Sequence, residues 1–384
     1  METQASTTQV SLAKGIDAAK LERELNAMWA EMSAPEGDDK AAGVVRACVL
    51  NLVVYAEGAE ERAEVDDLLA EVVERHPCRA IVITAERGAV ESRLEAFVST
   101  RCQLSSRGAK RICGEQITIE AAGSAVDTAS SAVAPLLVPD VPVFLWWKDI
   151  PHYEDKLFAR LSGMADRVVI DSAFFNRPHE DLRRLAALLE RERLRVSDLN
   201  WGRLTSWRAL VAGFWDVADY RESLSRVAKV VIEYDPPDRS HADIAPKALL
   251  ALGWMASSLG WEVSDEGTKF DDTRARFVLK DGDREVEALL VPTDDAAGRD
   301  GWLTSLTIST EAGDEFVVEL QLEERHLRTG ARLREACLTC ERVLAYEART
   351  EGQRLSAELD ILSRDDVYER AVAAASRLLA ALGA

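Results

Sequence analysis

The chain has 384 residues, of which 67 are acidic and 47 basic, so its formal net charge at pH 7 is −20. A chain this acidic is a poor candidate for general nucleic-acid binding, which depends on Lys and Arg contacts to phosphates, and for docking on anionic membranes. Its 47% hydrophobic and 30% charged residues are typical of a globular protein, and its length favours two or three domains.

The N-terminal residues Met1–Val10 have neither the basic segment nor the apolar core of a secretory signal. The longest weakly charged run, Thr128–Trp147, contains Asp140 and three prolines and is too broken to span a bilayer. We therefore expect a cytoplasmic protein whose six cysteines are mostly reduced.

The first half of the chain predicts a helical arm followed by an α/β domain. Apolar residues recur on one face of a helix over Ser11–Ser33, and the Pro-, Gly- and charge-rich Ala34–Gly43 indicates a linker. Nearly continuous apolar strands then alternate with helices, which favours a parallel sheet covered on both faces. The expected strands are Ala47–Tyr55, Arg79–Thr84, Ile112–Glu120, Val141–Trp147 and Arg167–Asp171. The expected helices are Glu60–Arg75, Ala125–Leu137, Tyr153–Gly163, Pro178–Arg193 and one long helix over Ser197–Arg226.

The second half predicts an α+β domain with an antiparallel meander, because short turns separate its alternating apolar and polar runs. The expected strands are Val227–Tyr234, Arg274–Leu279, Glu285–Val291, Leu303–Ser309 and Glu315–Gln321, and the expected helices are Ile244–Leu259 and Asp365–Leu382. The predicted fold class is thus α/β, a mostly parallel sheet domain followed by an α+β domain. We expect the arm and linker at 1–43, the α/β domain at 44–226 and the α+β domain at 227–384, with the last boundary between 165 and 228.

The sequence nominates no catalytic site. It has no GxGxxG after a strand, no GxxxxGK[ST], no GxSxG and no HExxH, and its five histidines are scattered through different segments. The residues therefore nominate no enzyme by themselves, and we expect no metal site and no cofactor.

A basic segment stands out in this acidic chain. Arg101, Arg107, Lys110 and Arg111 give Arg101–Arg111 four positive charges and no acid. Such a local reversal of charge is a candidate site for a phosphate or an acidic partner face. The alternative is a solvated loop that balances nearby acidic residues.

Two Trp-rich segments are candidate partner-binding surfaces. Trp146 and Trp147 end an apolar strand, where ligands bind in open parallel sheets, and they would point to opposite faces, so that one can be core while the other lines a rim. The second segment, Leu199–Asp216, combines Trp and Arg as binding hot spots do, and the alternative is a helix that packs on its own sheet. Its candidate residues are Trp201, Arg203, Trp207, Arg208 and Trp215.

The cysteines offer one weak motif. Cys337 and Cys340 form a CxxC, which suits a redox pair, although two ordinary buried thiols are the alternative and a zinc site would need further ligands. Cys102 and Cys113, which flank the basic segment, are a second candidate pair.

Five sequence blocks between Val45 and Asp216 carry a family resemblance. The blocks are His76–Ile81 (HPCRAI), Cys113–Ile117 (CGEQI), Pro139–Trp147 (PDVPVFLWW), Ala165–Ser172 (ADRVVIDS) and Asp198–Arg208 (DLNWGRLTSWR). Their order and spacing resembles the glucose-6-phosphate dehydrogenase assembly protein family (OpcA).

The resemblance implies a non-enzymatic partner that associates with glucose-6-phosphate dehydrogenase and promotes its active oligomer and its response to substrate. That enzyme feeds the oxidative pentose phosphate pathway and makes NADPH. In photosynthetic bacteria the family's regulation is linked to thiol state, which makes thioredoxin a further candidate partner. Our hypothesis is therefore an assembly factor and allosteric activator of this dehydrogenase. The alternative is an α/β enzyme or sensor that binds a sugar phosphate near Trp146, Trp147 and Arg101–Arg111, and a third interpretation is a scaffold for some other protein.

Overall fold

The computed structural model describes residues 7–10, 16–32, 44–104, 111–152, 154–192, 194–236, 243–271, 274–293, 301–321, 326–334, 339–346 and 349–383. The chain divides into two compact units, each assembled from separate stretches of sequence. Unit 1 comprises Met1–Ile170, Leu194–Ser197 and Arg349–Arg364, and unit 2 comprises Asp171–Arg193, Asp198–Ala348 and Asp365–Ala384. These units follow compactness rather than chain order, so the expected domain limits at 43 and 226 stay predictions.

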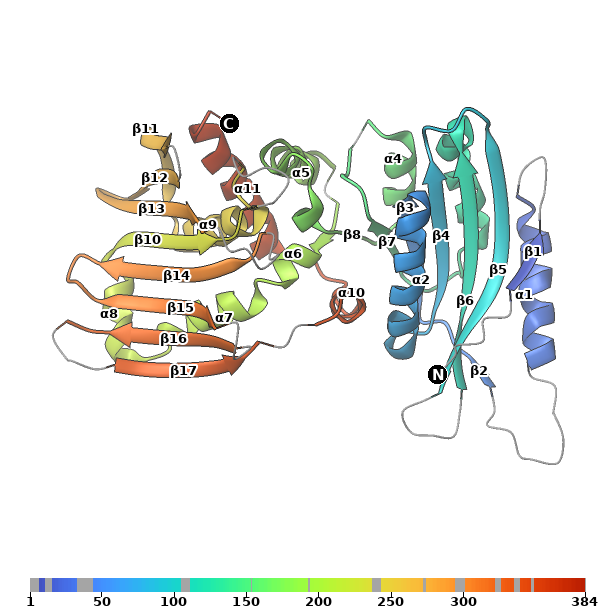
Figure 1. Ribbon diagram of the computed structural model, residues 1–384, viewed down its shortest axis with the longest axis horizontal. Helices are drawn as coiled ribbons and strands as arrows, with labels where there is room; N and C mark the ends of the chain where they lie inside the picture. The colour runs from blue at the N-terminus through green and yellow to red at the C-terminus, as the bar shows by residue number, and fades with distance from the viewer. Residues whose placement is uncertain are drawn as a thin grey trace. The chain divides into compact units, whose positions relative to one another are not determined.

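Unit 1 is built around a nine-stranded sheet with the order β1-β5-β6-β4-β3-β7-β8-β9, and β2 also pairs with β6 (Figure 1). Its strands are β1 (Thr7–Val10), β2 (Val44–Arg46), β3 (Leu50–Glu57), β4 (Cys78–Glu86), β5 (Arg93–Leu104), β6 (Arg111–Ala122), β7 (Val143–Trp147), β8 (Arg167–Ile170) and β9 (Val196–Asp198). The pairs β3–β4, β3–β7, β4–β6 and β7–β8 are parallel, whereas β5 runs antiparallel to β1 and β6. The mostly parallel sheet is as predicted, but β1, β2, the long β5 and β9 were missed.

The helices of unit 1 are α1 (Ala18–Met32), α2 (Gly58–Arg75), α3 (Ser130–Val133), α4 (Lys156–Ser162) and α10 (Glu351–Leu359), with 3₁₀ turns η1 (Gly123–Thr128) and η2 (Ala134–Leu136). Figure 1 shows α2 against one face of the sheet, where it packs on β3 and β4. The apolar face of α2 is fully buried at Val65, Leu69 and Val72, as the spacing of its apolar residues predicts. The helix predicted over Ala125–Leu137 is instead η1, α3 and η2 in succession, and Pro135 lies inside η2, where it cannot continue an α-helix.

Unit 2 contains the predicted antiparallel meander, as an eight-stranded sheet with the order β11-β12-β13-β10-β14-β15-β16-β17 (Figure 1). Only β10 and β13 are parallel neighbours among the described strands of this sheet. Its strands are β10 (Val227–Tyr234), β11 (Glu262–Asp271), β12 (Arg274–Asp281), β13 (Arg284–Pro292), β14 (Leu303–Thr310), β15 (Glu315–Gln321), β16 (His326–Arg332) and β17 (Thr339–Ala345). β11, β16 and β17 were not predicted from the sequence.

The helices of unit 2 are α5 (Pro178–Glu192), α6 (Leu199–Gly202), α7 (Thr205–Phe214), α8 (Arg221–Leu224), α9 (Pro246–Leu259) and α11 (Asp366–Ala381), with 3₁₀ turns η3 (Ser172–Phe174) and η4 (Ala218–Tyr220). α9 ends at Gly260, whose φ of 72° is the left-handed C-terminal cap that its sequence predicts. α9 packs against α11 so closely that a Cβ built on Gly253 would lie 2.4 Å from the Ala371 carbonyl oxygen.

The single long helix predicted over Ser197–Arg226 was wrong, because α6, α7, η4 and α8 replace it. Asp198 starts α6 by accepting a hydrogen bond from the Asn200 N–H. Gly202 ends α6 and Gly213 lies near the end of α7, and glycine is a poor helix former. Among the described residues, no helix combines the length and the apolar character that crossing a membrane requires.

Candidate functional site

Two of the five sequence blocks meet in unit 2, where Asp171 follows β8 and Arg203 follows α6. The Arg203 guanidinium donates one hydrogen bond to each carboxylate oxygen of Asp171, both at 2.7 Å. The two side chains are only 12% and 10% exposed, so this bidentate pair is largely shielded from water. The pair ties the segment after β8 to the segment after α6.

Asp198 forms the centre of a buried network beside this pair. Its carboxylate accepts hydrogen bonds from the Ser172 N–H at 3.0 Å and hydroxyl at 2.7 Å, the Asn200 N–H at 2.9 Å and the Tyr368 hydroxyl at 3.2 Å. Burial and the nearby Asp171 charge raise the pKa of Asp198 to about 6, although the hydrogen bonds from Ser172 and Asn200 oppose this. The network joins three chain segments of unit 2 and holds α6 in place.

The Trp residues of the same stretch differ in exposure. Trp201 is 4% exposed, donates its indole N–H to Asp365 at 2.9 Å, and lies 3.6 Å from the guanidinium carbon of Arg208. Trp207 is also buried, at 3% exposure. These two residues are therefore part of the interior of unit 2, and Arg208 covers Trp201 from the partly exposed side.

Trp215 is partly exposed at the end of α7. Its ring packs edge-on against Phe316 with a centroid distance of 4.8 Å. It also lines a cavity of about 150 Å³ with almost entirely apolar walls, which include Trp254 and Met255 of α9. Of the Trp residues predicted as partner contacts, Trp215 has the side chain that a protein could reach on the described surface.

Trp146 and Trp147 are both buried in unit 1, at 2% and 1% exposure. Trp147 stacks on Tyr55 at 3.9 Å between ring centroids and meets Phe158 edge-on at 5.1 Å. They lie at the carboxyl end of a strand whose two faces are both covered, so neither forms the exposed rim that alternation along the strand suggested.

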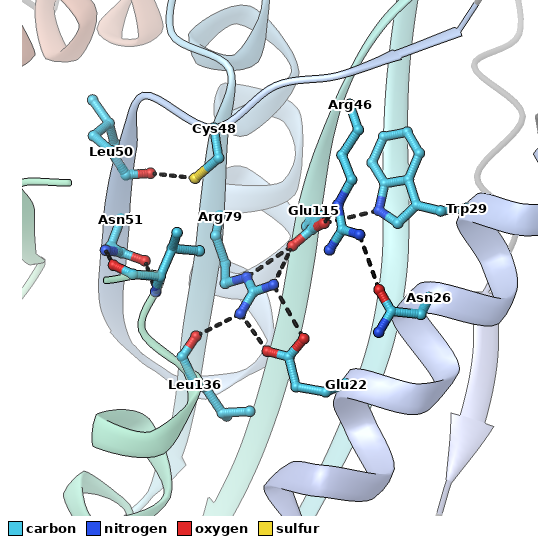
Figure 2. Close-up of polar contacts among 11 residues, drawn as sticks. Glu22, Asn26, Trp29, Arg46, Cys48, Leu50, Asn51, Arg79, Glu115 and Leu136 are labelled. Carbon is cyan, nitrogen blue, oxygen red and sulfur yellow. Dashed lines mark hydrogen bonds and ion pairs between the residues drawn. The ribbon is translucent and has the colours of Figure 1, made fainter. Parts of the chain in front are cut away.

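The HPCRAI and CGEQI blocks meet at the amino end of β4, where Arg79 pairs with Glu115 (Figure 2). Both side chains are buried, and Arg79 also bonds the Glu22 carboxylate of α1 and the Leu136 carbonyl oxygen. Glu115 accepts two further bonds, from the Trp29 indole at 2.8 Å and from Arg46 at 2.6 Å. Buried charges are stable only when paired in this way.

This cluster attaches the N-terminal helix to the sheet of unit 1, since Glu22 and Trp29 both lie on α1 (Figure 2). The blocks identified Arg79 and Glu115, but sequence reasoning missed Glu22 and Arg46. One indication of this cluster was present in the sequence: Trp29 lies on the apolar face of the predicted N-terminal helix, which also contains Glu22. The charges are mutually neutralised, so the cluster suits a structural attachment rather than proton transfer.

The basic segment and the CxxC are only partly described. Arg101 lies in β5 and Arg111 in β6, whereas Arg107 and Lys110 lie outside the described residues. Cys340 is opposite Ala331 in β17, and Cys337 also lies outside the described residues. Both groups stay predictions.

The structure describes more of the second candidate cysteine pair, Cys102 and Cys113. Cys113 is disulfide-bonded, and Cys102 lies directly opposite it in the register of β5 and β6. Cys48 and Cys78 are free thiols. Burial raises the pKa of Cys78 to about 12, so this thiol stays protonated and unreactive.

Comparison with family models gives two matches in sequence. Residues 70–187 match the model described as the glucose-6-phosphate dehydrogenase subunit N-terminal domain, of the OpcA assembly type. Residues 194–372 match the corresponding C-terminal domain. Together the two matches span most of the chain.

The relatives named "Putative OxPP cycle protein OpcA" include one from Nostoc punctiforme and one from Synechococcus elongatus. The one from Nostoc punctiforme is 36% identical over 62% of this chain and 51% of its own length. The one from Synechococcus elongatus is 29% identical over 79% of this chain and 68% of its own length. The chain therefore spans about half the length of the Nostoc relative.

Solved structures show only a low likeness. An NAD binding oxidoreductase from Klebsiella pneumoniae aligns with 87% of this chain and 96% of its own, with a TM-score of 0.49 and 10% sequence identity. A likeness of this level supports no argument about function.

Proposed function

We propose, on the premise that this chain belongs to the OpcA family of glucose-6-phosphate dehydrogenase assembly proteins, that it is a non-catalytic assembly factor and allosteric activator of that enzyme. The observation that carries the proposal is the ordered match to both domains of the glucose-6-phosphate dehydrogenase subunit. By this action it would support the oxidative pentose phosphate pathway and the supply of NADPH.

The proposed contact surface is centred on Trp215 in unit 2. A partly exposed Trp beside an apolar cavity, whose wall also includes Trp254, has the character of a binding hot spot. Arg208 is also partly exposed and would add a polar contact from the same block. The buried Trp201 and Trp207 would support this surface from beneath rather than touch the partner.

Activation in this proposal comes from differential binding. An assembly factor shifts an oligomer equilibrium only by as much as it binds one state more tightly than the other. A tenfold preference for the active oligomer corresponds to about 1.4 kcal/mol, which a single well-buried Trp contact can supply.

The decisive experiment mixes the purified chain with the dehydrogenase from the same organism. We expect a larger or more uniform oligomer by mass photometry and a higher rate at low glucose 6-phosphate, saturating with added chain. The control is the same titration with chain that has been heat-unfolded. If neither oligomer mass nor rate changes with folded chain, the proposal is wrong.

A further inference from the structure

Unit 2 contains a second cavity, of about 220 Å³, on a different part of its surface from the Trp215 cavity. Three structural segments line it: the turn between η3 and α5, the α6 region and the first turn of α9. Gly301 and Trp302, which precede β14, complete the wall. It holds none of the residues that line the cavity at Trp215.

The charge of this cavity is opposite to that of the chain. Its lining residues include two basic side chains, Arg203 and Lys247, and, within the part of the chain that the structure describes, no acidic one. The chain as a whole has a net charge of −20. Lys247 is 5% exposed, and its ammonium lies 5.7 Å from the centroid of the Trp302 ring. Arg203 is oriented by its bidentate bond to Asp171. Because Asp171 neutralises Arg203, Lys247 supplies the charge with which this wall attracts an anion.

The first turn of α9 adds to this attraction. α9 has 14 residues and begins at Pro246, and its N-terminus carries no side-chain capping hydrogen bond. Pro246 and Lys247 of that turn line the cavity, so the positive end of the helix lies at its wall. Phosphate groups bind at helix N-termini for this reason.

Asn200 supplies an independent indication of a ligand. It is 1% exposed and lines the cavity. Its orientation follows from Ser172: the Ser172 hydroxyl donates its proton to Asp198, so it must accept from the Asn200 amide nitrogen, at 3.1 Å. The Asn200 side-chain oxygen then remains without a hydrogen-bond partner among the described residues, although buried. A buried acceptor costs free energy unless a donor such as a ligand hydroxyl meets it.

The aromatic residues and the size of the cavity narrow the class of ligand. Phe174 is 59% exposed at the rim, and Trp302 forms part of the wall, so rings are available for the apolar face of a sugar. Pockets for drug-sized ligands measure roughly 300–1,000 Å³, so a cavity of about 220 Å³ suits one sugar ring rather than a dinucleotide.

We propose that this cavity binds a phosphorylated monosaccharide. The phosphate lies at the N-terminus of α9 beside Lys247, a sugar hydroxyl donates to the side-chain oxygen of Asn200, and the ring lies against Phe174. This assignment goes beyond the proposed association with a dehydrogenase and does not depend on it.

The test is isothermal titration calorimetry on the full chain, with glucose 6-phosphate, glucose and inorganic phosphate as separate probes. We expect saturable binding of glucose 6-phosphate, with glucose and inorganic phosphate each at least tenfold weaker, because only the ester engages both ends of the cavity. Absence of glucose 6-phosphate binding at millimolar concentration, or equal binding of inorganic phosphate, would overturn the proposal.

Two variants locate the site. Lys247→Met keeps the aliphatic stem and removes the charge, and we expect at least tenfold weaker binding. The control is Lys280→Met, at an exposed position of β12, which should weaken binding less than twofold. Phe174→Ala alters a side chain that is 59% exposed, and we expect about three- to tenfold weaker binding. The control is Phe270→Ala, an exposed aromatic of β11, which should weaken binding less than twofold. If Lys247→Met fails to fold, Phe174→Ala decides. Unchanged affinity in a folded Phe174→Ala variant contradicts this placement of the sugar ring.

Discussion

Arg203 holds both carboxylate oxygens of Asp171, 32 residues earlier in the chain, through two hydrogen bonds of 2.7 Å. The pair connects two blocks of sequence that the family resemblance had marked separately. It lies between the Asp198 network and the cavity at the N-terminus of α9, because Arg203 lines that cavity and Asp171 raises the pKa of Asp198. The stability of unit 2 and the shape of the cavity therefore depend on the same pair.

Replacing Arg203 with Lys should lower the free energy of unfolding by about 1–3 kcal/mol, because an ammonium cannot bond both oxygens at once. Urea denaturation followed by circular dichroism measures it. Arg226→Lys, at a 56% exposed side chain in a loose pair with Glu222, is the control and should change stability by less than about 0.5 kcal/mol. Equal stability of the two variants would show that the bidentate geometry contributes nothing.

Asp198 should make stability depend on pH in an unusual direction for an acid. Its folded pKa of about 6 is above its unfolded value of 3.8, so its contribution is fully present below pH 3.8 and is lost as pH rises through 6. We expect the wild-type free energy of unfolding, minus that of Asp198→Asn, to fall by up to roughly 3 kcal/mol between pH 4 and 7. Denaturant titrations at each pH give this difference. A difference that rises with pH would mean that the hydrogen bonds outweigh burial.

His179 should contribute in the opposite direction. Its ring Nε2 accepts the Ile244 N–H at 2.8 Å, which requires the neutral form. Burial lowers its pKa below 6.5, against the effect of Asp243 and together with that of Arg183. Its contribution is therefore complete above pH 6.5 and is lost as pH falls from there towards the folded pKa.

At pH 7.5 we expect His179→Ala to lose about 1–3 kcal/mol, because the buried Ile244 N–H loses its acceptor. The deficit should shrink as the pH is lowered below 6.5. Thermal unfolding of both proteins across this range is the measurement, and a deficit independent of pH would contradict the role of the neutral ring.

Gly253→Ala should destabilise the packing of α9 on α11. The new methyl would lie 2.4 Å from the Ala371 carbonyl oxygen and 3.0 Å from the Ala375 nitrogen, both backbone atoms that cannot move alone. Overpacking of this kind costs about 1–3 kcal/mol. Gly330→Ala in β16 is the matched control, since no described atom lies within 4 Å of the point that its new methyl would occupy. Calorimetric melting should separate the two, with the control near wild type.

Trp215→Ala should weaken activation of the dehydrogenase more than it lowers stability, because the side chain is partly exposed beside an apolar cavity. We expect at least a fivefold increase in the concentration needed for half-maximal activation, as for a Trp hot spot. Trp207→Ala is the comparison, since this buried residue should lose stability first. If Trp215→Ala activates normally, the proposed contact surface is misplaced.

Much of the fold was predictable because it depends on local patterns. Continuous apolar runs predicted β3, β4, β7 and β8, and short turns predicted the meander of unit 2. The strands that were missed, such as β5 and β16, contain several charged residues. These residues obscure the alternation of apolar and polar positions that predicts a strand. The long helix over Ser197–Arg226 was wrong because its Trp spacing also satisfies several short helices that turn to bury Trp201 and Trp207.

The sequence by itself determined the class of the fold, the absence of the common catalytic motifs and the family, since apolar period and block order are properties of the chain alone. Only the tertiary structure decided the partners of the charged residues. It paired Arg79 with Glu115 and Glu22, paired Arg203 with Asp171, and buried Trp146 and Trp147 together. It also brought Asn200, Lys247 and Phe174 to one cavity. The positions of these residues along the chain do not predict that they lie close together, because the pairing of distant side chains depends on how strands and helices pack.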